Sequence, residues 1–409
     1  MIYLNILFLL ASLFPFFVYP PALRFLSRFF RPLSRPESGE YFPFVSLVIP
    51  VRNGENLIVP KLRNALQLHY PPDRLEVIVI SDGSTDSTVA QASKISDSRI
   101  SIHVLSEHKG KNFAINFAVK KAIGDILLFS DVDALLEAKS LENMVPWFRL
   151  PEIGGVCGRK RIKTARDSLE QSQVAYNSYE EKQKLYESRI HSTVTNEGKI
   201  HAIRKSLFRP LPHRGMDDLL NLLCIVKQGK RFVFEPQAIA FIPSPSRKTR
   251  EEFIRRKRIV RGSFLAMWHH KSVFNPLQSG MYAPLVWVHK LGRRLASIFL
   301  VFTFVSTLLL SSKSLVFKTL LFIQLAGILA TTGNKFLRLP AGKKIPKVSG
   351  YLNLAYYFIL GNIGTLAGII ETLLIGKYTE KWTPLKRDAL HDASANNLNE
   401  VSRSVNGNA

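Results

Sequence analysis

Cysteine is scarce in this chain of 409 residues, and acidic residues are too few to balance the basic ones. The two cysteines, Cys157 and Cys224, lie far apart in apolar stretches, so they form neither a disulfide framework nor a metal-ligand spacing. We interpret both as small buried hydrophobic residues of a protein in a reducing compartment. Asp and Glu number 31 against 56 Lys and Arg, a net charge of +25 that predicts an anionic partner.

Patterns typical of nucleic-acid binding are also missing. The sequence has no helix-turn-helix, zinc-finger or RNP-like motif, which argues against nucleic acid as the anionic partner. Anionic lipid headgroups and a phosphorylated substrate are the remaining candidates.

No charge precedes the first apolar run, residues 2–19, whereas a secretory signal would carry basic residues there. Basic residues follow it instead, in "RFLSRFFRPLSR" (24–35). The run is long enough to span a bilayer, so the positive-inside tendency predicts an uncleaved transmembrane anchor over 1–23, a basic linker over 24–43 and a cytoplasmic domain beyond. A buried core helix is the alternative interpretation of the run.

Three further apolar segments lie near the C-terminus, at about 296–312, 314–333 and 350–376. They predict about three transmembrane helices over 296–376. Mixed apolar, aromatic and basic residues just before them predict an amphipathic interfacial segment over 276–295, with a core helix as the alternative.

The last apolar segment has two possible topologies. The basic loop 334–347 should be cytoplasmic, so a single crossing by 350–376 would place the basic stretch 377–387 outside, against the same charge rule. Either that segment is re-entrant or interfacial, or the rule fails at this end. The tail 377–409 is polar and is expected to be disordered after residue 388.

Strand-like aliphatic runs alternate with helical stretches within residues 44–275, which predicts an α/β domain there. The early runs lack polar alternation, as expected for parallel strands covered on both faces. Ligands of such sheets lie beyond the carboxyl ends of the strands, where the polar residues of this sequence gather. The candidate strands are 45–51, 75–82, 100–106, 126–132, 154–162 and 231–236.

Polar residues follow the first two of these strands. The first strand ends in a stretch that contains Pro50, Arg52, Asn53 and Glu55, and the second ends at Asp82. A turn and a helix with a Ser, Thr or Asp cap follow Asp82. Ordinary turn chemistry is the alternative interpretation of both stretches.

Basic and acidic residues then appear at two further element ends. Lys109 and Lys111 begin a helix in "HKGKNFAINFAVKKA", where they suit a phosphate group, although a solvated helix end would look the same. A strand is expected over 126–132; Asp131 lies at its end, and Asp133 follows it. Where the chain turns, both carboxylates can approach one hard cation, and Mg²⁺ or Mn²⁺ binds through one or two carboxylates plus substrate phosphate oxygens.

Two charged stretches complete the set. Asp217 and Asp218 begin a predicted helix, where the helix dipole alone would also favour acidic residues. Arg255 and Arg258 are three residues apart on an expected helix and so share one face, which can present a basic stripe to phosphates. A basic face near the membrane is the alternative for these arginines.

Seven stretches, in order, resemble the membrane-embedded, inverting family 2 glycosyltransferases of the GT-A fold, a group that includes the cellulose, hyaluronan and poly-N-acetylglucosamine synthases. The resemblance covers roughly residues 44–300 and extends to the membrane layout. It implies a GT-A (nucleotide-diphospho-sugar transferase) domain with a mixed, mostly parallel sheet and transmembrane helices at both ends. The stretches are "VSLVIPVRNGE", "VIVISDGSTDST", "KGKNFAIN", "ILLFSDVDA", "AIRKSLF", "GMDDLLNLL" and "RRKRIVRG".

The resemblance also implies roles for these residues. Asp131 and Asp133 would hold Mg²⁺ or Mn²⁺, and Asp218 would be the general base, with Asp217 in place of the usual glutamate. Asp82 would contact the uracil of the donor. The donor-binding residues would be Pro50, Arg52, Asn53, Glu55, Asp82, Lys111, Asp131, Arg255 and Arg258.

The implied activity is transfer of a sugar from a UDP-sugar to a glycan or lipid acceptor, with inversion to a β-linkage. The protein would be a multi-pass cell-membrane protein with a cytoplasmic catalytic domain; its partners would be the donor, the acceptor and membrane lipids, and the need for a partner subunit is left open. Two departures keep a non-processive glycolipid-forming transferase open: Ile259 stands where the family usually has a tryptophan, and Arg255 stands where it has a glutamine. A non-catalytic membrane scaffold is a further alternative, but the acidic set is complete.

Overall fold

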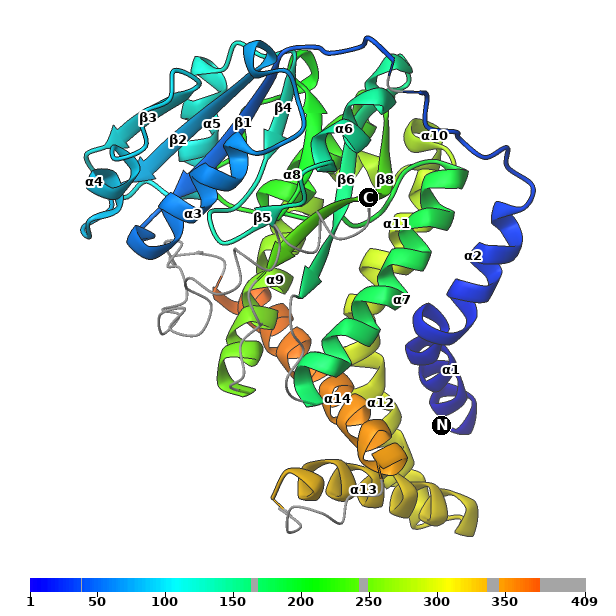
Figure 1. The fold of residues 1–409 in the computed structure, drawn as a ribbon. Coiled ribbons are helices and arrows are strands. Elements are labelled where there is room, and N and C mark those ends of the chain that lie inside the picture. Colours follow the sequence, from blue (N-terminus) through cyan, green and yellow to red (C-terminus); the bar gives the residue numbers. More distant parts are fainter. Residues whose placement is uncertain (38, 163–167, 243–248, 337–345, 376–409) are drawn as a thin grey trace.

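An eight-stranded sheet with flanking helices forms one end of the molecule, and long apolar helices extend from it (Figure 1). The computed structural model describes residues 1–37, 39–162, 168–242, 249–336 and 346–375. The predicted disordered tail, and most of the basic loop 334–347, lie outside the described residues.

The sheet is mixed, as the sequence predicted. Its order is β3-β2-β1-β4-β7-β6-β8-β5. The β1–β2, β1–β4, β2–β3 and β6–β8 pairs are parallel, and the other three pairs are antiparallel. The strands are β1 (Val45–Val51), β2 (Leu75–Asp82), β3 (Ile100–Leu105), β4 (Ile126–Phe129), β5 (Leu135–Leu136), β6 (Ile153–Ile162), β7 (His201–Arg204) and β8 (Arg231–Ile242).

The path of the chain explains where a site can form. The chain moves outward from β1 to β2 and β3, and then returns past β1 to β4 on its other side. The loops that leave β1, β2 and β4 therefore converge at one edge of the sheet, the position at which open α/β sheets bind ligands.

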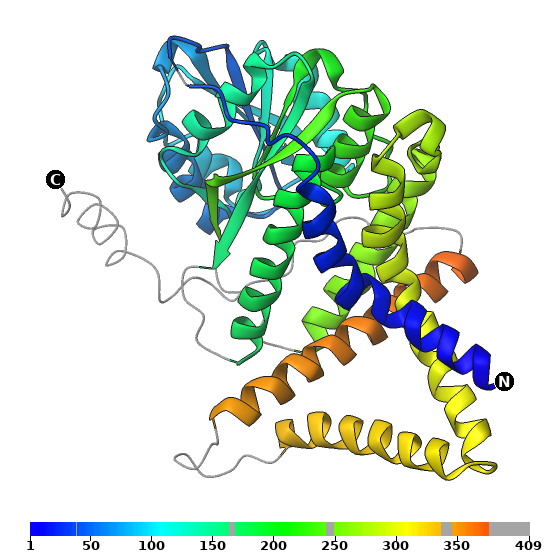
Figure 2. The same cartoon turned by 90° about the vertical axis from the view of Figure 1, so that its right-hand side faces the viewer.

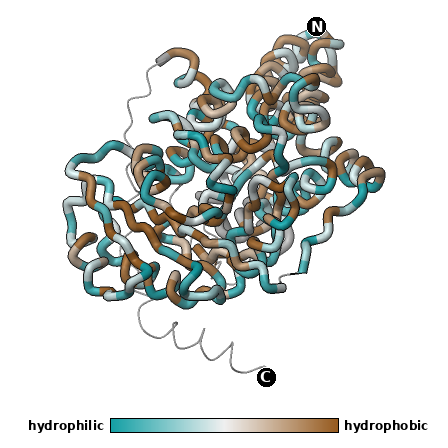
Figure 3. Tube along the Cα trace, turned by 90° about the horizontal axis from the view of Figure 1, so that it is seen from above, coloured by the Kyte–Doolittle hydropathy of each residue, from teal (hydrophilic) through white to brown (hydrophobic). Residues whose placement is uncertain are grey.

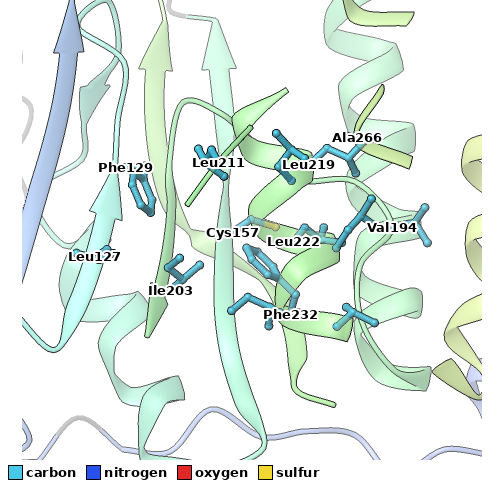
Figure 4. Close-up of a cluster of buried hydrophobic side chains, with 14 of the residues drawn as sticks. Leu127, Phe129, Cys157, Val194, Ile203, Leu211, Leu219, Leu222, Phe232 and Ala266 are labelled. Carbon is cyan, nitrogen blue, oxygen red and sulfur yellow. The ribbon is translucent and has the colours of Figure 1, made fainter. Parts of the chain in front are cut away.

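Helices cover both faces of the sheet and bury two apolar clusters. One cluster joins β1 and β2 to Ile58 and Leu62 of α3, and the other includes Phe129, Phe232 and residues of α8 (Figure 4). Cys157 and Cys224 are both buried free thiols, as predicted. The helices of this domain are α3 (Glu55–Leu66), α4 (Thr88–Ala92), α5 (Lys111–Lys121), α6 (Ser140–Met144), α7 (Ser168–Ile190), α8 (Asp217–Lys227) and α9 (Thr249–His269).

Four helical runs of the described chain are long and apolar enough to cross a membrane. They extend away from the sheet (Figure 2). Hydrophobic residues, shown in brown, are frequent along these runs and along the central strands (Figure 3). The number of runs agrees with the predicted anchor and three C-terminal helices. The runs are Ile2–Ser27, Tyr282–Ser311, Leu315–Gly333 and Leu354–Leu374.

Two of these runs are longer than the sequence indicated. The first comprises α1 (Ile2–Leu13), a π-helical segment (Phe14–Val18) and α2 (Tyr19–Ser27), so it continues into the predicted basic linker. After α10 (Pro276–Ser279), the second run joins α11 (Tyr282–Val286) through the π-helical segment Trp287–Gly292 to α12 (Arg293–Ser311). Much of the predicted interfacial segment is thus the first part of the α12 run. The domain boundaries themselves stay predictions.

A buried carboxylate ties the membrane helices to the sheet domain. Glu187 of α7 accepts hydrogen bonds from the Tyr19 hydroxyl at 2.9 Å and from the Val194 amide at 2.9 Å, and it pairs with Nδ1 of His289. Its side chain is fully buried. Because an unpaired buried charge is costly, these contacts fix α2 and the α12 run against α7.

The last run packs along α9. Glu371 of α14 (Pro346–Ile375) forms ion pairs with Lys257 at 2.5 Å and with Arg261 at 2.9 Å. Gly364 and Gly368 face the same helix, since a Cβ at either position would lie within 3 Å of an α9 side chain. The remaining helix, α13 (Leu315–Phe336), connects α12 to α14.

Gly158 provides a test of the β6–β8 packing. A Cβ at this position would lie 2.3 Å from the Ala238 carbonyl oxygen, next to a register shift between Cys157 and Arg159. We expect Gly158→Ala to lower the free energy of unfolding by about 1–3 kcal/mol, because backbone atoms cannot yield as a flexible side chain would. Thermal unfolding in detergent measures this. Gly327→Ala is the control, since nothing lies within 4 Å there, and equal stability of both variants would contradict the packing.

Candidate active site

The loops after β1 and β2 are hydrogen-bonded to each other. The Asn53 side-chain oxygen accepts from the Thr85 amide at 2.9 Å, and Glu55 accepts from the Ser87 amide at 3.1 Å. Asn53 has φ of 50°, a left-handed conformation that asparagine tolerates better than most residues. A Cβ on Gly54 would lie 3.7 Å from the Val132 side chain, so this loop borders the loop after β4.

Asp82, at the end of β2, holds the start of α5. Its carboxylate accepts from the backbone amides of Lys109 at 2.8 Å and Gly110 at 2.9 Å, and it contacts Nδ1 of His108 at 2.8 Å. The next residue, Gly83, has φ of 59°, and a Cβ there would lie 2.5 Å from the His108 amide nitrogen. Asp82 therefore positions Lys111, the first residue of α5, while its predicted contact with the uracil stays a prediction.

The two carboxylates after β4 are each paired with a lysine. Asp131 contacts Nζ of Lys111 at 2.8 Å and Nζ of Lys199 at 2.9 Å, and Asp133 contacts Lys199 at 2.6 Å. Burial alone would raise the pKa of Asp131, but Lys111 and Lys199 hold it well below its usual value. Asp131 is therefore ionised, and both acids face the ammonium of Lys199.

Lys111 also reaches the start of α8. Its Nζ lies 3.0 Å from Asp217, so the Asp131 and Asp217 oxygens are within about 6 Å of each other. Although burial opposes the charged form, Asp131 and Asp217 raise the pKa of Lys111 above its usual value. One ammonium thus joins the loop after β4 to α8, which lies 86 residues further along the chain.

Asp218 lies beside this network. Its Oδ1 accepts from the Leu219 amide at 2.8 Å, and its Oδ2 would lie 3.6 Å from a Cβ on Gly198. Burial, followed by the charge of Asp217, raises the pKa of Asp218 to about 6, while Lys290 and Lys111 oppose the increase. A carboxylate with a pKa close to neutral is suited to accept a proton near pH 7.

The donor atoms around Asp131 and Asp133 fit a hard divalent cation. The ammonium of Lys199 lies between the two carboxylates and marks a position at which both face one positive charge. Oxygen ligands from one or two carboxylates, completed by phosphate oxygens, are the set that Mg²⁺ or Mn²⁺ takes. Within the described ranges no group of three or more His, Cys, Asp or Glu side chains could hold a metal.

The predicted arginines lie on α9, which passes the start of α8. The Gly262 carbonyl of α9 faces the Met216 amide at 3.4 Å. Arg258 and Arg255 precede Gly262 by four and seven residues, so both are on the helix face directed toward α8. Arg255 pairs with Glu252 at 2.7 Å. Pro50 lies within β1, and the predicted donor contacts of these residues stay predictions.

Two lysines of the site were not singled out in the sequence. Lys199 precedes β7, the strand that pairs with β4, so strand pairing brings it to Asp131. Lys61 of α3 is fully buried and donates to Ser130 Oγ at 2.7 Å and to the Ala134 carbonyl at 2.6 Å. Burial lowers the pKa of Lys61 to about 7. One sequence feature could have identified Lys61: it lies between Ile58 and Leu62, at a helix position where their spacing predicts a buried side chain.

A cavity at the other end of the central strands is not part of this site. It has a volume of about 830 Å³ and is lined by residues such as Pro43, Gly124 and Lys205, which lie at the opposite edge of β1 and β4. The charged residues named above all lie at the carboxyl edge instead.

Comparison with known proteins identifies the domain. Residues 46–211 match the family model described as Glycosyl transferase family 2. This part of the chain is a family 2 glycosyltransferase domain. The mannosyltransferase PcManGT of Pyrobaculum calidifontis, solved with GDP-Man and Mn²⁺, has the same fold, with a TM-score of 0.69 and 22% identity over 92% of this chain and 99% of that one.

Curated relatives match parts of the glycosyltransferase domain. The β-monoglucosyldiacylglycerol synthase of Nostoc sp. is 31% identical over 131 residues, which are 31% of this chain and 28% of that protein. The poly-β-1,6-N-acetyl-D-glucosamine synthase of Staphylococcus aureus is 31% identical over 127 residues, 31% of this chain and 30% of that protein. The match thus spans less than a third of the length of either relative.

The link between the two acids of α8 can be tested by titration. We expect Asp217→Asn to lower the pKa of Asp218 from about 6, because the substitution removes a negative charge that disfavours ionisation and leaves burial as the main cause. A ¹³C NMR titration of aspartate carboxyl groups measures this. Asp125→Asn, at the far end of β4, is the control. An unchanged pKa in Asp217→Asn would mean that the neighbouring charge does not act on Asp218.

Proposed function

We propose that this protein is a membrane-bound glycosyltransferase that transfers a sugar from a UDP-sugar to a glycan or lipid acceptor with inversion, using Asp218 as general base. The observation that carries the proposal is the Lys111 bridge between Asp131 and Asp217. It joins a pair of carboxylates suited to a donor diphosphate and its cation to a helix whose second residue is suited to accept a proton. Family membership of the domain and its similarity to two sugar-transferring relatives support it.

The residues divide the chemistry between them. Asp131 and Asp133 would hold Mg²⁺ or Mn²⁺, which when bound would neutralise charge that develops on the leaving diphosphate. Lys111 and Arg258 offer further positive charge to the same group. Asp218 takes the proton of the acceptor hydroxyl, whose oxygen forms the new bond to the anomeric carbon. The bond from that carbon to the diphosphate oxygen breaks, and the nucleoside diphosphate leaves with the electron pair.

The proposal extends to the cell membrane. Four candidate spans support a multi-pass protein, and the basic residues just after the first apolar run support a cytoplasmic glycosyltransferase domain. Such a domain would meet nucleotide-sugars made in the cytoplasm. Since the structural neighbour was solved with GDP-Man, donor screens with this protein should include GDP-sugars beside UDP-sugars.

Asp218→Asn tests the base. Asparagine has nearly the same shape as aspartate, and its side-chain oxygen can still accept the hydrogen bond from the Leu219 amide, but it cannot act as a base. We expect transfer to fall by about a hundredfold or more, with UDP binding unchanged. Release of UDP from membranes supplied with UDP-sugars measures transfer, and calorimetry with UDP measures binding. Activity equal to the native protein would remove Asp218 as the base, and no transfer by the native protein with any donor would refute the function.

Lys199→Met tests the cation site without an activity assay. The ammonium of Lys199 competes with a divalent cation for Asp131 and Asp133, so its removal should tighten Mn²⁺ binding in the absence of donor by about tenfold. Free Mn²⁺ measured by electron paramagnetic resonance reports this directly.

Lys139→Met, which removes an exposed lysine, is the matched control and should leave Mn²⁺ binding as it is. Weaker Mn²⁺ binding in Lys199→Met than in the control would contradict competition between the lysine and the metal at this position.

A further inference from the structure

A small cavity lies between the candidate base and the membrane helices. Its volume is about 130 Å³, and it is lined by β6, α7 and the segment 195–197. That segment touches α8, since Asn196 donates to the Asp218 carbonyl at 2.8 Å and Gly198 borders the Asp218 carboxylate. At the other side, Tyr176 and Glu180 line the cavity and belong to the part of α7 that meets the α12 run.

The cavity walls carry polar groups without partners. Lys184 is 6% exposed, and among the described residues its ammonium forms neither an ion pair nor a hydrogen bond; it lies 5.4 Å from the Phe234 ring. Glu180, Glu181 and Glu197 also line the cavity and interact with Lys184 electrostatically, but they are paired with Arg293, Arg159 and Lys160. Thr195 Oγ1 is also buried and lacks a hydrogen bond in the described chain, whereas Arg159 Nε lies 3.7 Å from a carboxylate oxygen of Glu181. Buried polar groups are normally satisfied, so the Lys184 ammonium and the Thr195 hydroxyl indicate a polar ligand, and the ammonium indicates an anionic one.

Two further cations stand at the membrane side of the cavity. Lys290 and Arg294 are both partly buried, and in the part of the chain that the structure describes neither makes an ion pair or a hydrogen bond. They lie four residues apart on one helix, where like charges repel each other. Lys290 interacts electrostatically with Lys184 and Arg294, which repel it, and with Asp218 and Glu180, which attract it. A further anion placed among the three cations would relieve the remaining repulsion.

The depth of these cations in the membrane identifies the source of the anion. The run Tyr282–Ser311 has 30 residues, whereas about 20 residues cross the hydrocarbon layer, so roughly its first ten would lie outside that layer, where Tyr282, Leu285 and Val286 pack into the core of the sheet domain at headgroup level. Lys290 falls at the end of that part and Arg294 one turn beyond it. This is the level at which a bilayer presents the phosphate groups of its lipids. A soluble glycan would have no reason to meet cations at this depth.

We infer that Lys184, Lys290 and Arg294 form a binding site for the phosphate of an anionic membrane lipid, whose headgroup enters the cavity and presents its hydroxyl to Asp218 as the sugar acceptor. The acceptor role rests on the proposed function; the binding site does not. It differs from what the name of the glucosyldiacylglycerol synthase relative indicates, because diacylglycerol carries no phosphate.

Lipid binding by the full-length protein tests the site. The protein is placed in phosphatidylcholine nanodiscs that contain a small share of phosphatidylglycerol, and native mass spectrometry measures the phosphatidylglycerol retained. We expect retention by the native protein and a loss of about tenfold or more in Lys290→Met/Arg294→Met, because two charge-assisted contacts to phosphate are removed. Lys313→Met/Lys318→Met removes two exposed charges elsewhere in the same membrane region and should change nothing.

Further measurements in the same assay test whether binding depends on charge and whether the ligand is a lipid phosphate or free phosphate. Lys290→Arg/Arg294→Lys should retain the lipid, and loss of binding there would overturn a site based on charge. Retention of diacylglycerol equal to that of phosphatidylglycerol would overturn recognition of phosphate. Displacement of the lipid by millimolar inorganic phosphate would show a site for free phosphate and overturn the lipid as its ligand.

The outcomes also separate this inference from the proposed function. If the native protein binds phosphatidylglycerol but transfers no sugar from any donor, the proposed function fails and the lipid site stands. If it transfers sugar equally well to diacylglycerol and in the Lys290→Met/Arg294→Met variant, the lipid-phosphate site fails and the proposed function stands.

Discussion

The ammonium of Lys111 is the contact on which the site depends. It lies 2.8 Å from Asp131 and 3.0 Å from Asp217, and these acids come from loops that no backbone pairing joins. The three side chains are held at these distances only if the lysine is placed accurately, and Asp82 places it. The Asp82 carboxylate fixes residues 108–110 through three hydrogen bonds, so the start of α5 cannot drift from the end of β2. The family 2 glycosyltransferase domain thereby brings its acids together through cations.

Much of the fold could be predicted because its strands are uninterrupted aliphatic runs. The predicted strands at 45–51 and 75–82 coincide with β1 and β2, whose residues are buried on both faces and so leave a clear pattern. Strand β7 was missed because its four residues, His201–Arg204, begin and end with a charged or polar side chain and so form no aliphatic run. The helix boundaries at the membrane were predicted too short because charged residues such as Arg24, Lys290 and Arg293 continue the helices beyond the apolar stretches.

The acidic residues of the site could be predicted from the sequence, but the lysines that lie beside them could not. Asp131 and Asp133 follow a strand, and Asp217 and Asp218 open a helix, so both pairs have a local signal. Lys199 and Lys61 have none, because their proximity to Asp131 arises from strand order and helix packing over distances of 70 residues. Asp82 could be predicted as a site residue from its position at the end of a strand. The sequence could not reveal that its carboxylate accepts hydrogen bonds from the backbone amides of Lys109 and Gly110.

The opposite environments of Asp131 and Asp218 connect the two halves of the molecule. Both acids lie at one sheet edge, Asp131 partly exposed and Asp218 buried; two lysines hold the pKa of Asp131 down, whereas burial and Asp217 raise that of Asp218. The carboxylate near its cation partners therefore stays charged, and the one beside the cavity can exchange a proton. Lys111 influences Asp218 from the sheet side and Lys290 influences it from the membrane side. Asp218 thus lies where the glycosyltransferase domain meets the membrane helices, which is where a donor from water and an acceptor from a bilayer would have to meet.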